Sequence, residues 1–294
     1  MTADRSIGIC CIPLLLGGLF GCGGNAPSTV LVTLPNQPSD PHRSTLVVVT
    51  YNVLADRVRL DERLPALMNV LRESNADVIA VQEVDDWFLN ALEEQPWFKE
   101  AYEGTRSKGR LEAPGGQCIL SRIPILQWEA FDLPGVQGRT VVIARLSVNG
   151  NRTSVATFHL ESRLEDGPTR AKQLDAVFDR LGLGEAIVMG DFNFSDRAKP
   201  ESDHIPGEFV DFWPAVHRDQ PGFTWDVALN PAAKEGSFPG ETSGRIDRIL
   251  LRSQYWKGSK VKLIGDKAIG DVGNRYPSDH FGVTGTLTRK ETRP

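Results

Sequence analysis

The chain has 294 residues, enough for one large domain or two small ones. Its composition, 40% hydrophobic and 24% charged, is ordinary for a soluble globular protein. The net charge of −5 argues against a protein that holds bulk nucleic acid by charge alone. It does not exclude a nuclease, because a bound divalent cation would change the local field.

The first 22 residues have the pattern of an export signal. The apolar run from Ile7 to Phe20 is too short to span a bilayer comfortably but has the length of a signal-peptide hydrophobic region. It ends in Leu19-Phe-Gly-Cys22, which resembles a bacterial lipoprotein signal. We therefore expect a lipoprotein-type signal peptide over 1–22, and a protein exported and anchored to a membrane by lipid on Cys22, facing the periplasm or exterior. A secreted form, or a cytoplasmic one that begins at another start codon, is the alternative.

The next segment, 23–44, is rich in Pro, Gly, Ser and Asn, a composition that cannot pack a core. We expect it to be an extended tether. Residues 45–294 show no further break in composition and are expected to form one domain. Cys118 is the one cysteine of that domain, so the sequence predicts a buried thiol and no disulfide framework there.

From Thr45 onward, strands and helices alternate. Apolar residues at helical spacing predict helices, β-branched apolar runs predict strands, and Asn149-Gly150 predicts a hairpin turn. The expected helices are 60–74, 86–94 and 169–181. The expected strands are 46–49, 78–81, 116–120, 139–148, 152–158, 186–189, 246–251, 261–264 and 281–287. Hairpins and helices together indicate an α/β or α+β sandwich.

Polar residues gather in five short segments, most of them at strand ends. The segments are Thr50-Tyr-Asn52, Gln82-Glu83, His159-Leu-Glu-Ser162, Gly190-Asp-Phe-Asn193 and Pro277-Ser-Asp-His280. Rigid scaffolds commonly present catalytic groups at such places. Carboxylate and amide oxygens suit Mg²⁺, and imidazoles can stabilise charge on a phosphate. The pattern therefore indicates a metal-dependent phosphodiesterase.

The residue types indicate several roles. A carboxylate at Glu83, directly after an apolar strand, is costly unless it is paired or binds a cation. Asn52 offers a neutral oxygen and two donors, suited to a metal-bound water and a phosphate oxygen. Asp191 and Asn193 lie two residues apart, on the same side of an extended segment. We expect Asp191 to orient and deprotonate the attacking water, and Asn193 to hold a nonbridging oxygen or that same carboxylate.

In their order along the chain, the five segments resemble the endonuclease/exonuclease/phosphatase superfamily. Within it, the chain most resembles the tyrosyl-DNA phosphodiesterase 2 family. The supporting segments are Arg170 with Gln173-Leu174, Val210-Asp-Phe-Trp213, Phe223-Thr-Trp-Asp226, Ile246-Asp-Arg-Ile249 and Tyr276-Pro-Ser-Asp-His280. The resemblance implies a catalytic domain over 45–294, folded as a four-layer sandwich of two packed, mostly antiparallel β-sheets flanked by helices.

The resemblance also implies a metal site. It makes Glu83 the main ligand of Mg²⁺, with Mn²⁺ as an alternative, and places Asp279 close to the metal beside Asn52. Two departures from the family pattern concern the substrate. Ser195 stands where the family has a substrate-contacting arginine, and Tyr51 stands where it commonly has tryptophan.

The histidines and several further residues complete the expected site. By resemblance, His280 stabilises charge on the phosphate and is oriented and kept protonated by Asp247, while His159 is a second cationic clamp. The expected substrate-binding residues are Arg139, Ser162, Arg170 and Trp225. For Arg170 the alternative is a solvated helix face, and for Trp225 it is a core or lid aromatic.

Three functions remain open from the sequence. The first is hydrolysis of phosphodiester bonds by in-line attack of water, on DNA or DNA ends, by a monomer. The alternative is a phosphatase or phospholipase C-like hydrolase of phospholipid head groups or inositol phosphates. A binding module without catalysis is the third. A groove for nucleic-acid strands should carry Arg and Lys along its length, whereas a head-group pocket should be closed and rimmed by aromatic residues.

Overall fold

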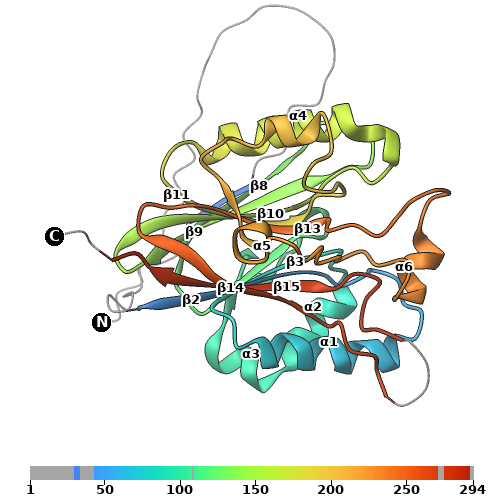
Figure 1. The fold of residues 1–294 in the computed structure, drawn as a ribbon. Helices are drawn as coiled ribbons and strands as arrows, with labels where there is room; N and C mark the ends of the chain where they lie inside the picture. The colour runs from blue at the N-terminus through green and yellow to red at the C-terminus, as the bar shows by residue number, and fades with distance from the viewer. Residues whose placement is uncertain (1–29, 34–42, 108, 271–274, 292–294) are drawn as a thin grey trace, which may run out of the picture.

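Two β-sheets pack face to face in the computed structural model, and helices cover both outer faces (Figure 1). The structure describes residues 30–33, 43–107, 109–270 and 275–291. Helix α4 (Gly167–Leu181) covers one sheet, and α1 (Leu60–Ser74), α2 (Asp86–Glu94) and α3 (Pro96–Ala101) lie on the outer side of the other. The expected four-layer sandwich is confirmed.

Most neighbouring strands in both sheets run antiparallel. The first sheet has the order β1 (Val30–Thr33), β8 (Ile125–Asp132), β9 (Thr140–Val148), β10 (Asn151–His159), β11 (Glu185–Asp191), β13 (Asp247–Arg252), β12 (Val210–Asp211). The second has the order β14 (Trp256–Ile264), β15 (Gly282–Arg289), β2 (Thr45–Asn52), β3 (Val78–Gln82), β7 (Cys118–Ser121), β4 (Glu103–Gly104). The remaining elements are β5 (Arg106–Ser107), β6 (Arg110–Leu111), α5 (Phe212–Val216), α6 (Pro231–Gly236), and three 3₁₀ turns, η1 (Pro114–Gly116), η2 (Leu164–Asp166) and η3 (Glu201–His204).

One parallel pair of strands in each sheet positions the site. Helix α1 connects β2 to β3, and α4 connects β10 to β11. Parallel strands need such a crossover and end at the same edge of the sheet. Asn52 is accordingly the register partner of Gln82, which precedes Glu83, and His159 is the partner of Asp191. Each β-α-β unit therefore brings two polar segments to one edge of its sheet. Because the two sheets pack face to face, all four segments lie near one another.

Apolar side chains fill three layers: between the sheets, beneath α1 to α3, and beneath α4. A polar bridge crosses the middle layer near the catalytic edge. The buried Gln82 amide donates to the hydroxyl of Thr50 at 3.1 Å and to that of Thr157 at 2.8 Å, so it connects the second sheet to the first. These hydrogen bonds satisfy the buried amide and fix the register of the two sheets near the site.

The expected helices 60–74 and 86–94 are confirmed, as is the hairpin at Asn149-Gly150. Strand β8 and helices α3, α5 and α6 were not predicted. Three of these elements are only five or six residues long, too short to show a helical period. Cys118 is fully buried, as expected, and contacts Thr105.

Four residues of the predicted tether, Val30–Thr33, form the strand β1, which pairs with β8 at the edge of the first sheet. The predicted signal peptide, with Cys22, lies outside the described residues, so its cleavage and lipidation stay predictions. Among the residues that are described, no helix has the length and apolar character required to cross a bilayer.

Candidate active site

A cavity of about 240 Å³ lies at the edge where the parallel strand pairs end. Most of the expected site residues line it: Glu83, Arg139, His159, Ser162, Asp191, Asn193, Trp225, Asp279 and His280. Asn52 and Asp247 are fully buried and each contacts lining residues. Arg170 is the one expected residue that lines only a different cleft.

Asn52 connects the two sheets at this edge. Its side-chain amide donates to Glu83 at 3.0 Å and to Asp191 at 3.1 Å, and its oxygen accepts from the backbone N–H of Leu54 at 3.1 Å. The residue therefore aligns one carboxylate from each sheet. Direct contact between its oxygen and a metal stays a prediction.

Glu83 and Asn193 both adopt left-handed backbone conformations, with φ of 57° and 54°. Such conformations cost about 1–3 kcal/mol in residues other than glycine and cluster at functional sites. The left-handed backbone conformation directs the Glu83 carboxylate toward the cavity. One of its oxygens accepts a hydrogen bond from the N–H of Ala55 at 3.0 Å. Burial would raise the pKa of Glu83, but the hydrogen bonds from Asn52 and Ala55 and the charge of His280 lower it, so the group is ionised.

Asp191 is held in a fixed position at the end of β11. Gly190 precedes it because any side chain there would meet the carbonyl oxygen of Phe158, only 2.3 Å from a Cβ. One carboxylate oxygen accepts from the backbone N–H of Asn193 at 2.9 Å. The Asn193 side chain instead donates to the carbonyl of Leu160 at 2.9 Å. Asn193 thus holds the carboxylate through its main chain.

The environment of Asp191 suits a proton acceptor. Its second oxygen lies 3.4 Å from Nε2 of His159 and 3.7 Å from Nε2 of His280. Burial, together with the charge of Asp247, raises the pKa of Asp191 to about 7. A carboxylate with a pKa near neutrality can accept a proton from water and release it again.

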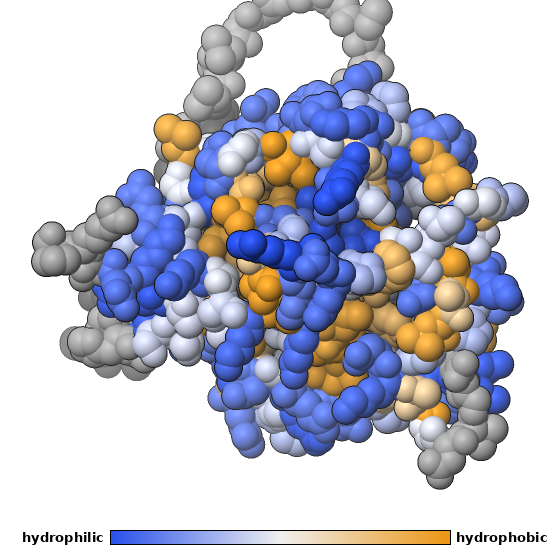
Figure 2. All heavy atoms as spheres, in the orientation of Figure 1, coloured by the Kyte–Doolittle hydropathy of each residue, from blue (hydrophilic) through white to orange (hydrophobic). Residues whose placement is uncertain are grey.

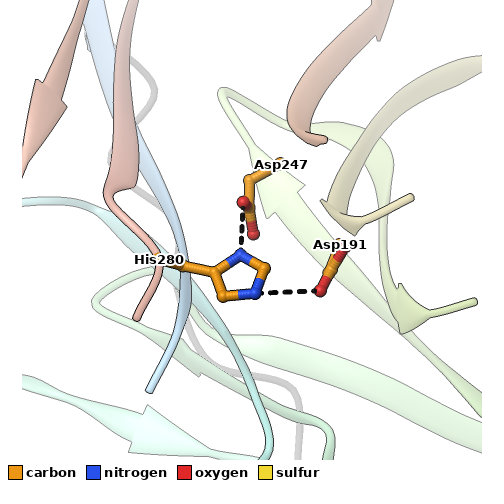
Figure 3. Close-up of side chains that lie close together, drawn as sticks. All are labelled: Asp191, Asp247 and His280. Carbon is orange, nitrogen blue, oxygen red and sulfur yellow. Dashed lines mark hydrogen bonds and ion pairs between the residues drawn. The ribbon is translucent and has the colours of Figure 1, made fainter. Parts of the chain in front are cut away.

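His280 lies between two carboxylates (Figure 3). Its Nδ1 is 2.8 Å from Asp247, and its Nε2 faces Asp191. Burial alone would lower the pKa of His280, but Asp247 and Asp191 hold it well above the usual value for histidine. The imidazole is therefore a cation that carries a proton on both nitrogens, as expected of a group that stabilises phosphate charge.

Two groupings of side chains are candidates for a divalent cation, and the chemistry of one of them fits. Ligand atoms of Asp191, Asp247 and His280 lie within 4.8 Å of one another, but a histidine that carries a proton on both nitrogens has no lone pair for a metal. Glu83 and Asp279 both line the cavity, and burial, together with the charge of Glu83, raises the pKa of Asp279. A cation would relieve this repulsion, and hard carboxylate oxygens fit Mg²⁺ or Mn²⁺.

His159 differs from its expected role as a cationic clamp. Burial and the neighbouring charge of Arg139 lower its pKa to about 3, so its environment favours the neutral ring. Arg139 lines the same cavity, and its Nε has no hydrogen-bond partner within the described part of the chain. The cation on this side of the cavity is therefore Arg139.

Gln137, which no sequence pattern singled out, organises this side of the cavity. The side-chain oxygen of Gln137 accepts from Arg139 at 3.1 Å and from the N–H of Ser162 at 2.9 Å, and its amide donates to the Ser162 hydroxyl at 3.0 Å. The fully buried Glu161 holds the loop by accepting from the backbone N–H groups of Val136 and Gln137.

Arg170 is a structural residue. Its guanidinium forms an ion pair with Glu201 at 2.8 Å and donates to the backbone carbonyls of Glu161 and Arg163. Only 5% of the Arg170 side chain and 2% of the Glu201 side chain are exposed. The alternative of a solvated helix face is therefore wrong, and the contacts that bind α4 to the segment after His159 enclose the guanidinium that was expected to reach phosphate.

Trp225 forms one wall of the cavity. Its ring centroid lies 4.9 Å from that of His280, and the two residues form a β-bridge. Two residues that the sequence analysis did not select hold the backbone of this region: Thr224 accepts from the N–H of Asp247 at 2.9 Å, and Asn230 donates to the carbonyl of Asp279 at 3.0 Å. Contact of Trp225 with substrate stays a prediction.

The comparisons with known proteins agree with this geometry. The Endonuclease/Exonuclease/phosphatase family matches residues 49–280. Tyrosyl-DNA phosphodiesterase 2 of Xenopus laevis is 26% identical, with 93% of this chain and 74% of that protein covered. The human protein of the same name is also 26% identical, with 87% and 72% covered.

Solved structures have the same fold. The D. rerio TDP2 structure complexed with single-strand DNA product matches with a TM-score of 0.71 and 25% identity, covering 84% of this chain and all of that one. The human Nocturnin catalytic domain with bound sulfate matches with a TM-score of 0.64 and 16% identity, covering 91% of this chain and all of that one. The latter likeness concerns the fold alone.

Proposed function

Because the chain belongs to the endonuclease/exonuclease/phosphatase family, whose enzymes are metal-dependent phosphodiesterases, we propose that it hydrolyses the phosphodiester at a DNA end, with a 5′-phosphotyrosyl end as the leading substrate. The relatives named tyrosyl-DNA phosphodiesterase 2 support this choice. The observation that carries it is the buried Asp247–His280–Asp191 array beside Glu83, in one cavity.

The side chains divide the reaction between them. The Asp191 carboxylate orients the attacking water and takes its proton, since its pKa lies near neutrality. The His280 cation and Arg139 line the cavity and stabilise the charge that develops on the phosphate. Glu83 and Asp279 would hold Mg²⁺, and a bound cation supplies Lewis-acid polarisation of a phosphoryl oxygen.

The neutral His159 and the Ser162 hydroxyl also line the cavity, and we expect both to donate hydrogen bonds to the phosphate. Asn52 keeps the carboxylates of Glu83 and Asp191 in register, so the metal side and the proton-accepting side of the site stay aligned. Trp225 offers an apolar wall to the sugar or base next to the scissile bond.

An activity panel with Mg²⁺ tests this function. It compares 5′-phosphotyrosyl DNA, plain single- and double-stranded DNA, sphingomyelin and inositol phosphates at equal enzyme concentration. We expect the highest kcat/KM with 5′-phosphotyrosyl DNA. Preference for sphingomyelin or an inositol phosphate would overturn the proposal in favour of a head-group hydrolase, and preference for plain DNA would make the enzyme a nuclease.

We also propose that the enzyme is exported and anchored by lipid at Cys22. The support is the apolar run Ile7 to Phe20, followed by Leu19-Phe-Gly-Cys22. Mass spectrometry of the mature N-terminus in a bacterial host decides it: a diacylglyceryl adduct on Cys22 is expected, and Cys22→Ser should abolish it. An unmodified chain that begins at Met1 in the soluble fraction would contradict export and favour repair inside the cell.

A further inference from the structure

We propose that a cleft lined by Arg197 and Arg218, separated from the catalytic cavity by an intervening groove, binds a nucleic-acid strand through these two arginines. The site would hold phosphates several nucleotides away from the scissile bond. The inference rests on the proposed function, because it assumes that the substrate carries a strand. It adds a binding surface that lies outside the catalytic residues.

An intervening groove lies between the active site and the cleft with the two arginines. A groove of about 440 Å³ shares Asn193, Trp225, Glu241 and Ile246 with the catalytic cavity. A further cleft of about 380 Å³ shares Ser195 with that groove and is lined by Arg197. Because four residue steps span at most about 14 Å, the path from Asn193 to Arg197 is only a few nucleotides long.

The cations of the intervening groove are already neutralised. Arg170 is paired with Glu201, and Lys199 forms an ion pair with Asp203. Glu165 also lines this groove. A nucleic-acid strand that lies along this groove would therefore be attracted only weakly. Stronger binding of its phosphates requires unpaired cations outside the groove.

The cleft beyond Ser195 provides such cations. Arg197 and Arg218 are exposed and line it together, and neither forms an ion pair with any residue in the described part of the chain. Asp196, which also lines the cleft, is paired with Arg245 at 3.0 Å. The exposed Asp219 is the one lining acid without an ion pair among the described residues. Two free arginines thus face one free carboxylate.

Aromatic side chains lie in the same cleft. Phe223 and His217, both half-buried, line it beside the two arginines, and behind them Trp213 is buried in the core with its ring 5.0 Å from that of His217. Near α5, at the centre of Figure 2, hydrophilic side chains project from the surface between separate hydrophobic patches. Arginine beside aromatic surface is the composition of sites that bind single strands without sequence preference, through phosphate contacts and base stacking.

A binding assay tests the cleft separately from catalysis. Fluorescence anisotropy in EDTA measures the affinity of the full chain for a labelled single-stranded 12-mer as salt is varied. We expect Arg197→Gln with Arg218→Gln to weaken binding at least about tenfold. We also expect the slope of log K against log[salt] to fall by about 1.4, the value for two phosphate contacts on a single strand.

Arg152→Gln is the matched control, because this exposed arginine lies near the opposite end of β10 from His159. It should leave affinity and slope unchanged. An unchanged slope in the double variant, an equal loss in the control, or displacement of the 12-mer by poly-glutamate more readily than by unlabelled strand would overturn the proposal.

Steady-state kinetics separate this inference from the proposed function. The double variant should raise KM for a 5′-phosphotyrosyl 12-mer and leave KM for a 5′-phosphotyrosyl mononucleotide unchanged. If wild-type enzyme hydrolyses neither, the proposed function fails, and the salt-dependent binding still decides the cleft. If both KM values rise equally, the arginines act at the catalytic cavity and the separate site is refuted.

Discussion

Nδ1 of His280 lies 2.8 Å from a carboxylate oxygen of Asp247, and both side chains are buried. The other oxygen of Asp247 has no hydrogen-bond partner in the described part of the chain. Within the described part of the chain, the side chain of His280 is therefore the one hydrogen-bond partner of this carboxylate. The carboxylate holds the ring in one orientation and keeps it cationic next to Asp191.

Asp247→Asn should reduce kcat by about 10²-fold or more, because the loss of one preorganised charge at a developing oxyanion typically costs that much. Asp175→Asn is the matched control, since Asp175 forms an exposed pair with His204 at the same 2.8 Å distance. The control should keep the wild-type rate. Equal activity of both variants in a steady-state assay would show that Asp247 does not act through His280.

Asp191→Asn and His280→Ala should each lose most of kcat and keep KM within a few-fold of wild type. Both groups are assigned to the transition state rather than to ground-state binding. The check is a full substrate titration of each purified variant with circular dichroism as a folding control. A loss confined to KM would place the residue in substrate binding.

Arg170→Ala should lower the free energy of unfolding by about 3–5 kcal/mol, because it leaves the buried Glu201 carboxylate unpaired. Chemical denaturation measures this. The double variant Arg170→Met with Glu201→Leu should recover most of the loss, since it removes both buried charges. If Arg170→Ala instead kept wild-type stability and raised KM, the arginine would have the substrate role that its sequence context first indicated.

Cys118 should resist alkylation in the folded protein. Burial raises the pKa of its thiol to about 11, so at pH 8 the folded thiol is protonated as well as inaccessible. Because the folded pKa lies above the unfolded one, this contribution to stability is complete below the unfolded pKa and is lost as pH rises through about 11. Peptide mapping after iodoacetamide treatment at pH 8 should find Cys118 modified only when denaturant is present.

Local patterns predicted most of the strands and helices and most of the cavity residues, whereas the four-layer arrangement was implied by the family resemblance. The apolar runs that end near Asn52, Glu83, His159 and Asp191 can be recognised as strands from the sequence. Because neighbouring parallel strands end at the same edge of a sheet, the polar residues at their ends lie side by side. Gln137 could not be found in this way, because it lies in a loop, and its contacts with Arg139 and Ser162 exist only after folding.

Arg170 was misread although the signal was present. It lies four residues before Leu174, on the same face of α4 as Val177 and Leu181, which is the buried face. A charge on such a face requires a buried partner, and Glu201 is that partner. The neutral state favoured for His159 could not be predicted, because it depends on burial and on Arg139 from a distant loop.

The most direct test of the central claim, a metal-dependent phosphodiesterase centred on Glu83, is the Mg²⁺ dependence of hydrolysis by wild type, Glu83→Gln and Glu208→Gln. Glu208 is an exposed glutamate paired with Arg252 and serves as the control. Wild type and Glu208→Gln should be active with Mg²⁺ and inactive in EDTA. Glu83→Gln should lose about 10²-fold or more of kcat/KM, a few kcal/mol of transition-state stabilisation. A wild-type rate and an unchanged Mg²⁺ titration in Glu83→Gln would contradict the account.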